Sequence, residues 1–199
     1  ACARAGGAAR RGRGHGHADA LSVIFRLGSQ EVLLDPGTYT YTGDRTWRNY
    51  FRGTRAHNTV VVDQMDQAVQ ETAFMWAQPF QTQVAFREND HDGVVTILAY
   101  HDGYMKRAGV THWRAILYLS PDSWLVWDCL TGKGVHQLEL NWHLGIEPVI
   151  KSGLNVLSSE GKSICLAVEG VTNTLHRGEV DPIGGWLSRS YGQKEPITT

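Results

Sequence analysis

Residues 15–63 have the sequence HGHADALSVIFRLGSQEVLLDPGTYTYTGDRTWRNYFRGTRAHNTVVVD, in which histidines and carboxylates stand at the edges of apolar, β-branched runs. His15 and His17 are separated by one residue. In an extended strand both imidazoles would therefore project from the same face, followed on that face by Asp19. The stretch predicts a β-rich fold with a functional site at its strand ends.

Two further side chains complete a candidate metal site. Asp35 ends the apolar run EVLLD, and His57 precedes the β-branched segment NTVVVD. Two imidazoles and a carboxylate are a common ligand set for zinc, and three protein ligands leave a position for water or substrate. We therefore hypothesise that His17, Asp35 and His57 bind one divalent metal, with zinc preferred. Calcium and manganese stay as alternatives because a carboxylate takes part. The other interpretation is that these are ordinary hydrogen-bonding residues of a β-domain.

Short strand-like runs recur along the chain, separated by turn sequences such as Asp-Gly, Ser-Pro-Asp and Gly-Lys-Gly. Residues 44–54 are polar and aromatic and predict no more than a short helical turn within a loop. Many short strands at close spacing are typical of an all-β, antiparallel β-sandwich. The expected strands cover 18–27, 31–35, 59–63, 82–87, 94–100, 113–119, 124–129, 136–142, 155–157, 164–168 and 172–175.

Length and composition indicate one domain. The 199 residues are enough for a single substantial core. Residues 1–14 consist mainly of Gly, Ala and Arg without an apolar period, which predicts a linker or flexible leader. The domain is then expected to span 15–199. No apolar run approaches the roughly 18 residues that a membrane-spanning helix needs, so no membrane partner is expected.

The charge of the chain is unevenly distributed. Residues 1–57 contain nine arginines and no lysine against four acidic residues, hence a local charge of +5, although the whole chain has a net charge of −1. Arginine binds carboxylates and sulfates through paired hydrogen bonds, so this charge suits an acidic polysaccharide. A nucleic-acid partner is not expected, because no recognition motif accompanies the charge.

Several motifs in a fixed order resemble the C-terminal β-domain of the heparinase II/III-like polysaccharide lyases. The first of these motifs, at 15–19, contains the histidine pair and the acid that follows it, and the last, at 56–60, contains the third histidine. Weaker matches continue at 100–104, 112–114, 142–143 and 185–186, so the likeness covers nearly the whole chain. The motifs are HGHAD at 15–19, LDPGTY at 34–39, RNYFR at 48–52 and AHNTV at 56–60.

The resemblance implies an enzyme that cleaves acidic polysaccharides of the heparin, heparan sulfate or alginate type by β-elimination. It implies a β-sandwich of the lyase super-sandwich type, cut at both ends, and an N-terminal helical (α/α)-toroid domain that this chain lacks. By position, His15 becomes the catalytic histidine facing the substrate cleft, and its ordinary pKa of about 6.5 suits a hydrogen-bond donor to a uronate. His17, Asp35 and His57 become ligands of a mostly structural zinc. The principal base and acid are expected in the helical domain, so the isolated chain is expected to have little activity. The resemblance also suggests a periplasmic or secreted protein.

Five side chains near these positions are candidates for contacting the sugar. Tyr39 and Tyr41 alternate with threonines, so they share a strand face and offer phenol groups, although packing is equally compatible with the pattern. Arg52, Arg55 and Asn58 flank the third histidine and are weaker candidates for binding sulfate or carboxylate groups. Asn58 has the alternative role of holding its loop through a local backbone hydrogen bond.

Two other functions compete with the lyase. The first is a non-catalytic, metal-stabilised β-sandwich that binds acidic glycans. The second is a cupin-type metalloenzyme, which the His-x-His pair alone favours. It is the weaker, because the glutamate expected a few residues after the pair is absent. The sequence does not distinguish heparinoid from alginate substrates, or endo from exo cleavage.

Overall fold

The computed structural model describes residues 16–89, 95–119, 123–151, 154–159, 162–166 and 172–199. The predicted leader at 1–14 and the predicted catalytic His15 lie outside these residues. The helices are α1 (Arg45–Arg52) and α2 (Met105–Ala108), with a 3₁₀ turn at Thr54–Ala56. The strands are β1 (Phe25–Leu27), β2 (Gln30–Leu33), β3 (Val60–Val62), β4 (Val69–Gln70), β5 (Trp76–Ala77), β6 (Thr82–Asn89), β7 (Val95–His101), β8 (Val110–Leu119), β9 (Ser123–Gly132), β10 (Leu138–Leu140), β11 (Pro148–Lys151), β12 (Leu154–Ser159), β13 (Lys162–Leu166), β14 (Glu179–Val180), β15 (Ile183–Gly184), β16 (Trp186–Ser190) and β17 (Gln193–Pro196).

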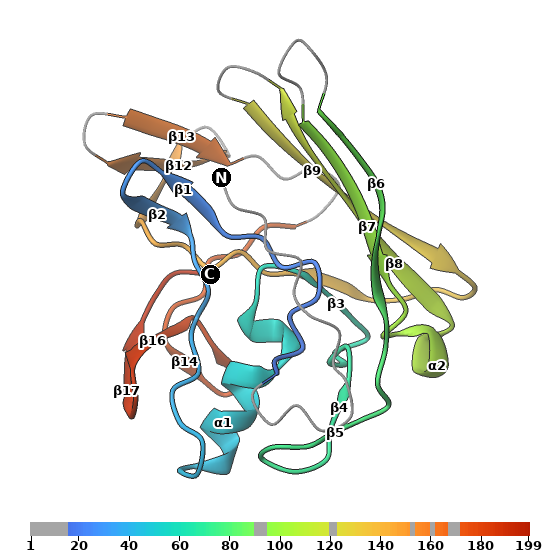
Figure 1. The fold of residues 1–199 in the computed structure, drawn as a ribbon. Coiled ribbons are helices and arrows are strands. Elements are labelled where there is room, and N and C mark those ends of the chain that lie inside the picture. Colours follow the sequence, from blue (N-terminus) through green and yellow to red (C-terminus); the bar gives the residue numbers. More distant parts are fainter. Residues whose placement is uncertain (1–15, 90–94, 120–122, 152–153, 160–161, 167–171) are drawn as a thin grey trace.

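Every strand pairing in the described residues is antiparallel. The largest sheet has the order β6-β7-β8-β9, and a second has the order β11-β12-β13. The remaining pairs are β1-β2, β3-β10, β4-β5, β14-β15 and β16-β17. Figure 1 shows the four-stranded sheet as one twisted layer, with β1, β2 and α1 on the other side of the molecule. The predicted all-β, antiparallel sandwich is confirmed.

One face of the four-stranded sheet points toward the interior of the molecule. Along β8, Val110, His112 and Arg114 are buried while the residues between them are only half-buried. This alternation follows from the two-residue period of a strand. The inward face therefore carries polar side chains as well as apolar ones, and these reach the N-terminal segment discussed below.

Three of the predicted elements differ from the observed ones. The strand expected at 172–175 is absent, since these residues lie in no strand. The strand expected at 18–27 is reduced to β1, and its first half is irregular, with Leu21 in the left-handed region at φ +61°. The loop at 44–54 contains the eight-residue helix α1 instead of a short turn. Asp44 caps this helix, since its carboxylate accepts hydrogen bonds from the backbone N–H groups of Thr46 and Trp47. No helix in the described part of the chain has the length and apolarity that a bilayer crossing demands.

The aromatic side chain of Phe51 anchors α1. It is fully buried, and its ring stacks on Tyr39 with centroids 5.4 Å apart. The rings of Trp47 and Tyr50 also pack against it, at 6.4 and 5.1 Å. The segment that follows Asp35 is thereby fixed against the helix that precedes His57.

We expect Phe51→Ala to lower the free energy of unfolding by about 3–5 kcal/mol, because it leaves a cavity under α1. Denaturant titration of the purified protein measures this change. Phe86→Ala is the matched control, since Phe86 is 47% exposed on the outer sheet face and its removal leaves no cavity. Equal losses for the two variants would contradict the anchoring role of Phe51.

Candidate metal centre

His57 presents one ring nitrogen to the centre of the site. Its side chain is fully buried directly after the 3₁₀ turn. Nδ1 lies 2.8 Å from the carbonyl oxygen of Gly53, so the hydrogen-bond network assigns the proton to Nδ1. Nε2 then carries the lone pair, which can accept a hydrogen bond or bind a metal ion. This is the arrangement in which a backbone carbonyl orients a metal-binding imidazole.

Asp35 approaches that nitrogen from a tight turn. Its Oδ2 lies 3.9 Å from Nε2 of His57, and its Oδ1 accepts a hydrogen bond of 2.8 Å from the N–H of Gly37. Gly37 has φ +80°, and a Cβ there would collide with the carbonyl oxygen of Ser188. Only glycine satisfies both conditions, so the Asp-Pro-Gly sequence fixes the direction of the Asp35 carboxylate.

His17, the third predicted ligand, lies against His57. Its Nδ1 lies 3.2 Å from Nε2 of His57, and its Nε2 lies 3.5 Å from the hydroxyl of Thr38. Burial lowers the pKa of His17 to about 3, with further lowering from His57, Arg48 and Arg52. The ring is therefore neutral, as a metal ligand must be.

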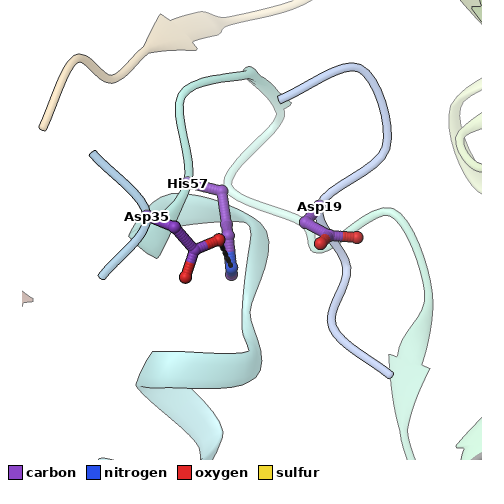
Figure 2. A group of neighbouring side chains, drawn as sticks. All are labelled: Asp19, Asp35 and His57. Atoms are coloured by element: carbon purple, nitrogen blue, oxygen red, sulfur yellow. Dashed lines mark ion pairs between the residues drawn. The ribbon is translucent and has the colours of Figure 1, made fainter. Parts of the chain in front are cut away.

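Asp19 joins the site as a donor that the sequence analysis did not assign. Donor atoms of Asp19, Asp35 and His57 all lie within 4.8 Å of one another. Figure 2 shows Asp35 facing His57, while Asp19 comes from a separate segment of the chain. Its signal in the sequence is its position two residues after His17, on the same face of the predicted strand.

The donors match what zinc prefers. The edge of a tetrahedron with zinc–nitrogen bonds of 2.0–2.1 Å is roughly 3.3 Å. The two facing imidazole nitrogens are 3.2 Å apart, so one ion can bind both once the hydrogen bond between them is given up. Carboxylates at the remaining positions are compatible with zinc and also with harder cations.

The predicted sugar contacts of Arg52 and Asn58 are not supported by their positions. Both side chains are fully buried. Arg52 donates from Nη1 to the carbonyl oxygens of Thr72 and Ala73, and its guanidinium lies 4.4 Å from the ring centroid of Trp76. The Asn58 side chain hydrogen-bonds backbone groups that are 24 to 85 residues away in sequence, and not the local backbone group of its predicted alternative role.

The other three candidates lie closer to the surface. Arg55 forms an ion pair of 2.6 Å with Glu139, and both side chains are about one-third exposed. Tyr39 packs in the aromatic cluster around α1. Tyr41 is half-buried and stacks on Tyr191 with ring centroids 6.0 Å apart. Tyr191 is 63% exposed, so this pair offers an aromatic surface.

A second buried polar chain runs across the four-stranded sheet. The N–H of Gly103 donates to Nδ1 of His101, whose Nε2 lies 3.1 Å from Nδ1 of His112. Nε2 of His112 lies 2.7 Å from Oδ1 of Asp128. The same carboxylate accepts two hydrogen bonds from Arg114, of 2.7 and 2.9 Å. Burial lowers the pKa of both histidines, so both are neutral near pH 7.

Comparison with known proteins identifies the family. The model of the family described as "Heparinase II/III-like, C-terminal" matches residues 2–199. Two solved structures of heparinase III are similar, one of them the BT4657 gene product with methylated lysines. Each is 18% identical in sequence, and the TM-scores are 0.70 for that product and 0.71 for the other. The likeness covers 92% of this chain and 27% of each heparinase III chain, so the chain spans about a quarter of their length. Comparison with the curated proteins gave no match.

The buried histidine pair should make the protein less stable in acid. The pKa of His101 is lowered by burial and by the neighbouring His112 and Arg114. The unfolded chain therefore takes up protons below pH 6.5 that the folded chain refuses. The contribution of these histidines to the free energy of unfolding should be fully present above pH 6.5. As the pH falls below that value, the free energy of unfolding should decrease by roughly 1.4 kcal/mol per pH unit for each such imidazole.

Urea titrations at pH 7.5 and 5.5 measure this loss. His101→Gln does not titrate and should show a smaller difference between the two pH values. His136→Gln is the control. His136 is half-buried and its pKa is raised by the hydrogen bond to Asp63, so its removal should enlarge the difference slightly. An unchanged pH dependence in His101→Gln would contradict the assignment.

Proposed function

The chain belongs to the heparinase II/III-like C-terminal family, and we propose that it is the β-sandwich of a polysaccharide lyase. The proposed enzyme cleaves uronic-acid-containing polysaccharides of the heparin, heparan sulfate or alginate type by β-elimination. Residues 15–199 are the proposed domain, residues 1–14 the proposed linker, and an N-terminal (α/α)-toroid domain of the same protein the proposed partner. A periplasmic or secreted location accompanies this proposal.

The meeting of Asp19, Asp35 and His57 is the observation that carries the proposal, because their donor atoms all lie within 4.8 Å of one another. The predicted ligand His17 lies beside this group, with its Nδ1 3.2 Å from Nε2 of His57. We propose that His17, Asp35 and His57 bind one divalent cation, with zinc preferred, and that Asp19 is a fourth donor. When bound, the ion supplies a fixed positive charge that links three chain segments.

β-Elimination beside a uronate has three requirements. The carboxylate must be neutralised, the C5 proton removed and the leaving O4 protonated. In the proposal His15 hydrogen-bonds the carboxylate, or tunes a tyrosine of the helical domain that acts as base and acid. His17 follows His15 by two residues, and metal binding would fix its position. It would thereby limit the directions in which the His15 side chain can point.

The positive charge around the site supports an anionic substrate. Arg48 and Arg52 are one turn apart on α1, and both lower the pKa of His17, which places their charge close to it. Arg55, Tyr39 and Tyr41 stay as proposed sugar contacts. Of these, Tyr41 lies at the exposed end, where Tyr191 extends its aromatic surface.

The alternative function is a non-catalytic β-sandwich that binds acidic glycans. One observation favours it. Four protein donors, with Asp19 included, fill a tetrahedral ion, and closed sites of this kind are typically structural. In that case the metal stabilises the glycan-binding surface, and no residue of this chain takes part in cleavage.

We expect about one zinc per chain by mass spectrometry of the purified protein. His57→Ala, which removes the buried ligand, should lose the metal and lower the melting temperature, because metal binding stabilises the folded state. Asp19→Asn tests the added donor and should weaken zinc binding without unfolding the chain. Asp63→Asn is the control for removing a carboxylate, since Asp63 pairs with His136 away from the site. A folded wild-type chain that takes up neither zinc nor another divalent metal when these are supplied would overturn the ligand assignment.

The isolated chain should release no unsaturated uronate products from heparan sulfate or alginate. The protein that joins it to its helical domain should release them, and the His15→Ala variant of that protein should be impaired. Ultraviolet absorbance of the unsaturated products measures both reactions. Product formation by the isolated chain would contradict the proposed division of the site, and binding without cleavage by the joined protein would favour the glycan-binding alternative.

A further inference from the structure

Every polar atom of the Asn58 side chain is used inside the protein. Nδ2 donates to the carbonyl oxygens of Val23 at 2.8 Å and Leu34 at 3.0 Å. Oδ1 accepts from the backbone N–H of His143 at 2.6 Å and lies 3.3 Å from its Nδ1. One fully buried amide therefore joins three segments that are distant in sequence.

Two of these segments carry proposed metal-site donors. The Val23 carbonyl belongs to the irregular segment that begins at His17, and Leu34 directly precedes Asp35. Asn58 itself follows His57. The Asn58 side chain therefore connects the chain segments on which all the proposed donors stand. No strand pairing in the described residues joins all three segments.

Arg114 reinforces this connection from the four-stranded sheet. Its Nη1 donates to the carbonyl oxygens of Leu21 at 2.7 Å and Asn58 at 2.6 Å. Its Nε and Nη2 are held by the carboxylate of Asp128. Leu21 has φ +61°, a conformation that costs a non-glycine residue free energy and persists only where its surroundings hold it. Arg114 supplies that hold two residues after Asp19.

We infer that Asn58 and Arg114 are positioning residues of the metal centre. They set the geometry in which the donors on the His17–Asp19 segment, Asp35 and His57 meet, without touching the ion. Asp128 acts indirectly, because its carboxylate orients the guanidinium of Arg114. The inference rests on the proposed metal site and extends it, because it assigns the affinity and geometry of that site to residues outside the ligand set.

Affinity and geometry can be measured without enzymatic activity. Zinc affinity follows from competition with a chromophoric chelator. Cobalt(II), bound in place of zinc, reports ligand geometry through the position and intensity of its visible absorption bands. Asn58→Ala removes the amide. Arg114→Lys keeps the charge but has one nitrogen, which cannot bond Leu21, Asn58 and Asp128 together. Both variants should bind zinc about 10–100-fold more weakly, with altered cobalt spectra and a retained fold by circular dichroism.

Tyr104→Phe is the matched control for losing a buried hydrogen bond to the backbone. The Tyr104 hydroxyl is buried and donates to the carbonyl oxygen of Val60 at 2.8 Å, in the core cluster around β3. This variant should lose stability but keep the affinity and the cobalt spectrum. A general effect of destabilisation would instead change all three variants alike.

The outcomes separate the two proposals. If the wild type binds zinc and the folded Asn58→Ala and Arg114→Lys variants match its affinity and spectrum, the positioning role is overturned. If the wild type binds neither zinc nor cobalt, the metal site itself is overturned and the positioning role falls with it. If Asn58→Ala does not fold, Arg114→Lys decides.

Discussion

Irregular backbone that is buried must find hydrogen-bond partners among side chains, and the site of this protein depends on that requirement. The segment after His17 lies in no strand, yet Ala20 and Leu21 are buried. Both groups of the Ala20 peptide are met by the Gln67 amide, whose Oε1 accepts from its N–H and whose Nε2 donates to its carbonyl oxygen. The Thr59 hydroxyl bonds the same carbonyl at 2.9 Å. In this segment, side chains satisfy the buried backbone groups that strand pairing would satisfy in a sheet. One of them, Thr59, belongs to the same segment as His57.

Burial and, to a smaller extent, neighbouring buried cations lower the pKa of His17 and keep its imidazole neutral. Arg48 and Arg52 lie on one face of α1 and donate to backbone carbonyl oxygens, Arg52 through Nη1 and Arg48 through Nε. Burial lowers the pKa of Arg52 to about 10, with Arg48 contributing, so it is still charged near pH 7. Positive charge beside His17 opposes its protonation. The two arginines therefore help to keep the ring of His17 neutral.

The sequence predicted the four-stranded sheet and two of the three side chains, Asp35 and His57, whose donor atoms the structure groups with Asp19. Strands β6 to β9 follow from alternating or continuous apolar runs between turn residues, and these patterns are local. Helix α1 was underestimated because its buried face consists of Arg48, Phe51 and Arg52, so it lacks the apolar period by which helices are recognised. The irregular backbone before β1 depends on Asn58 and Arg114. These partners are 35 to 93 residues away from it, and no local pattern records them.

The long-range hydrogen bonds also bear on how metal binding and folding are coupled. In small zinc domains the ligands are ordered only by the ion, so the apo chain is unfolded. Here Asn58 and Arg114 connect the ligand segments through hydrogen bonds that need no ion, and Arg114 is itself held by the sheet hairpin β8-β9. The segments that carry the proposed ligands are then mostly ordered before an ion binds. The cost of ordering the backbone therefore offsets less of the free energy of metal binding. A folded apo protein with a preformed site follows from this arrangement, because the residues that order the donors belong to the core of the domain.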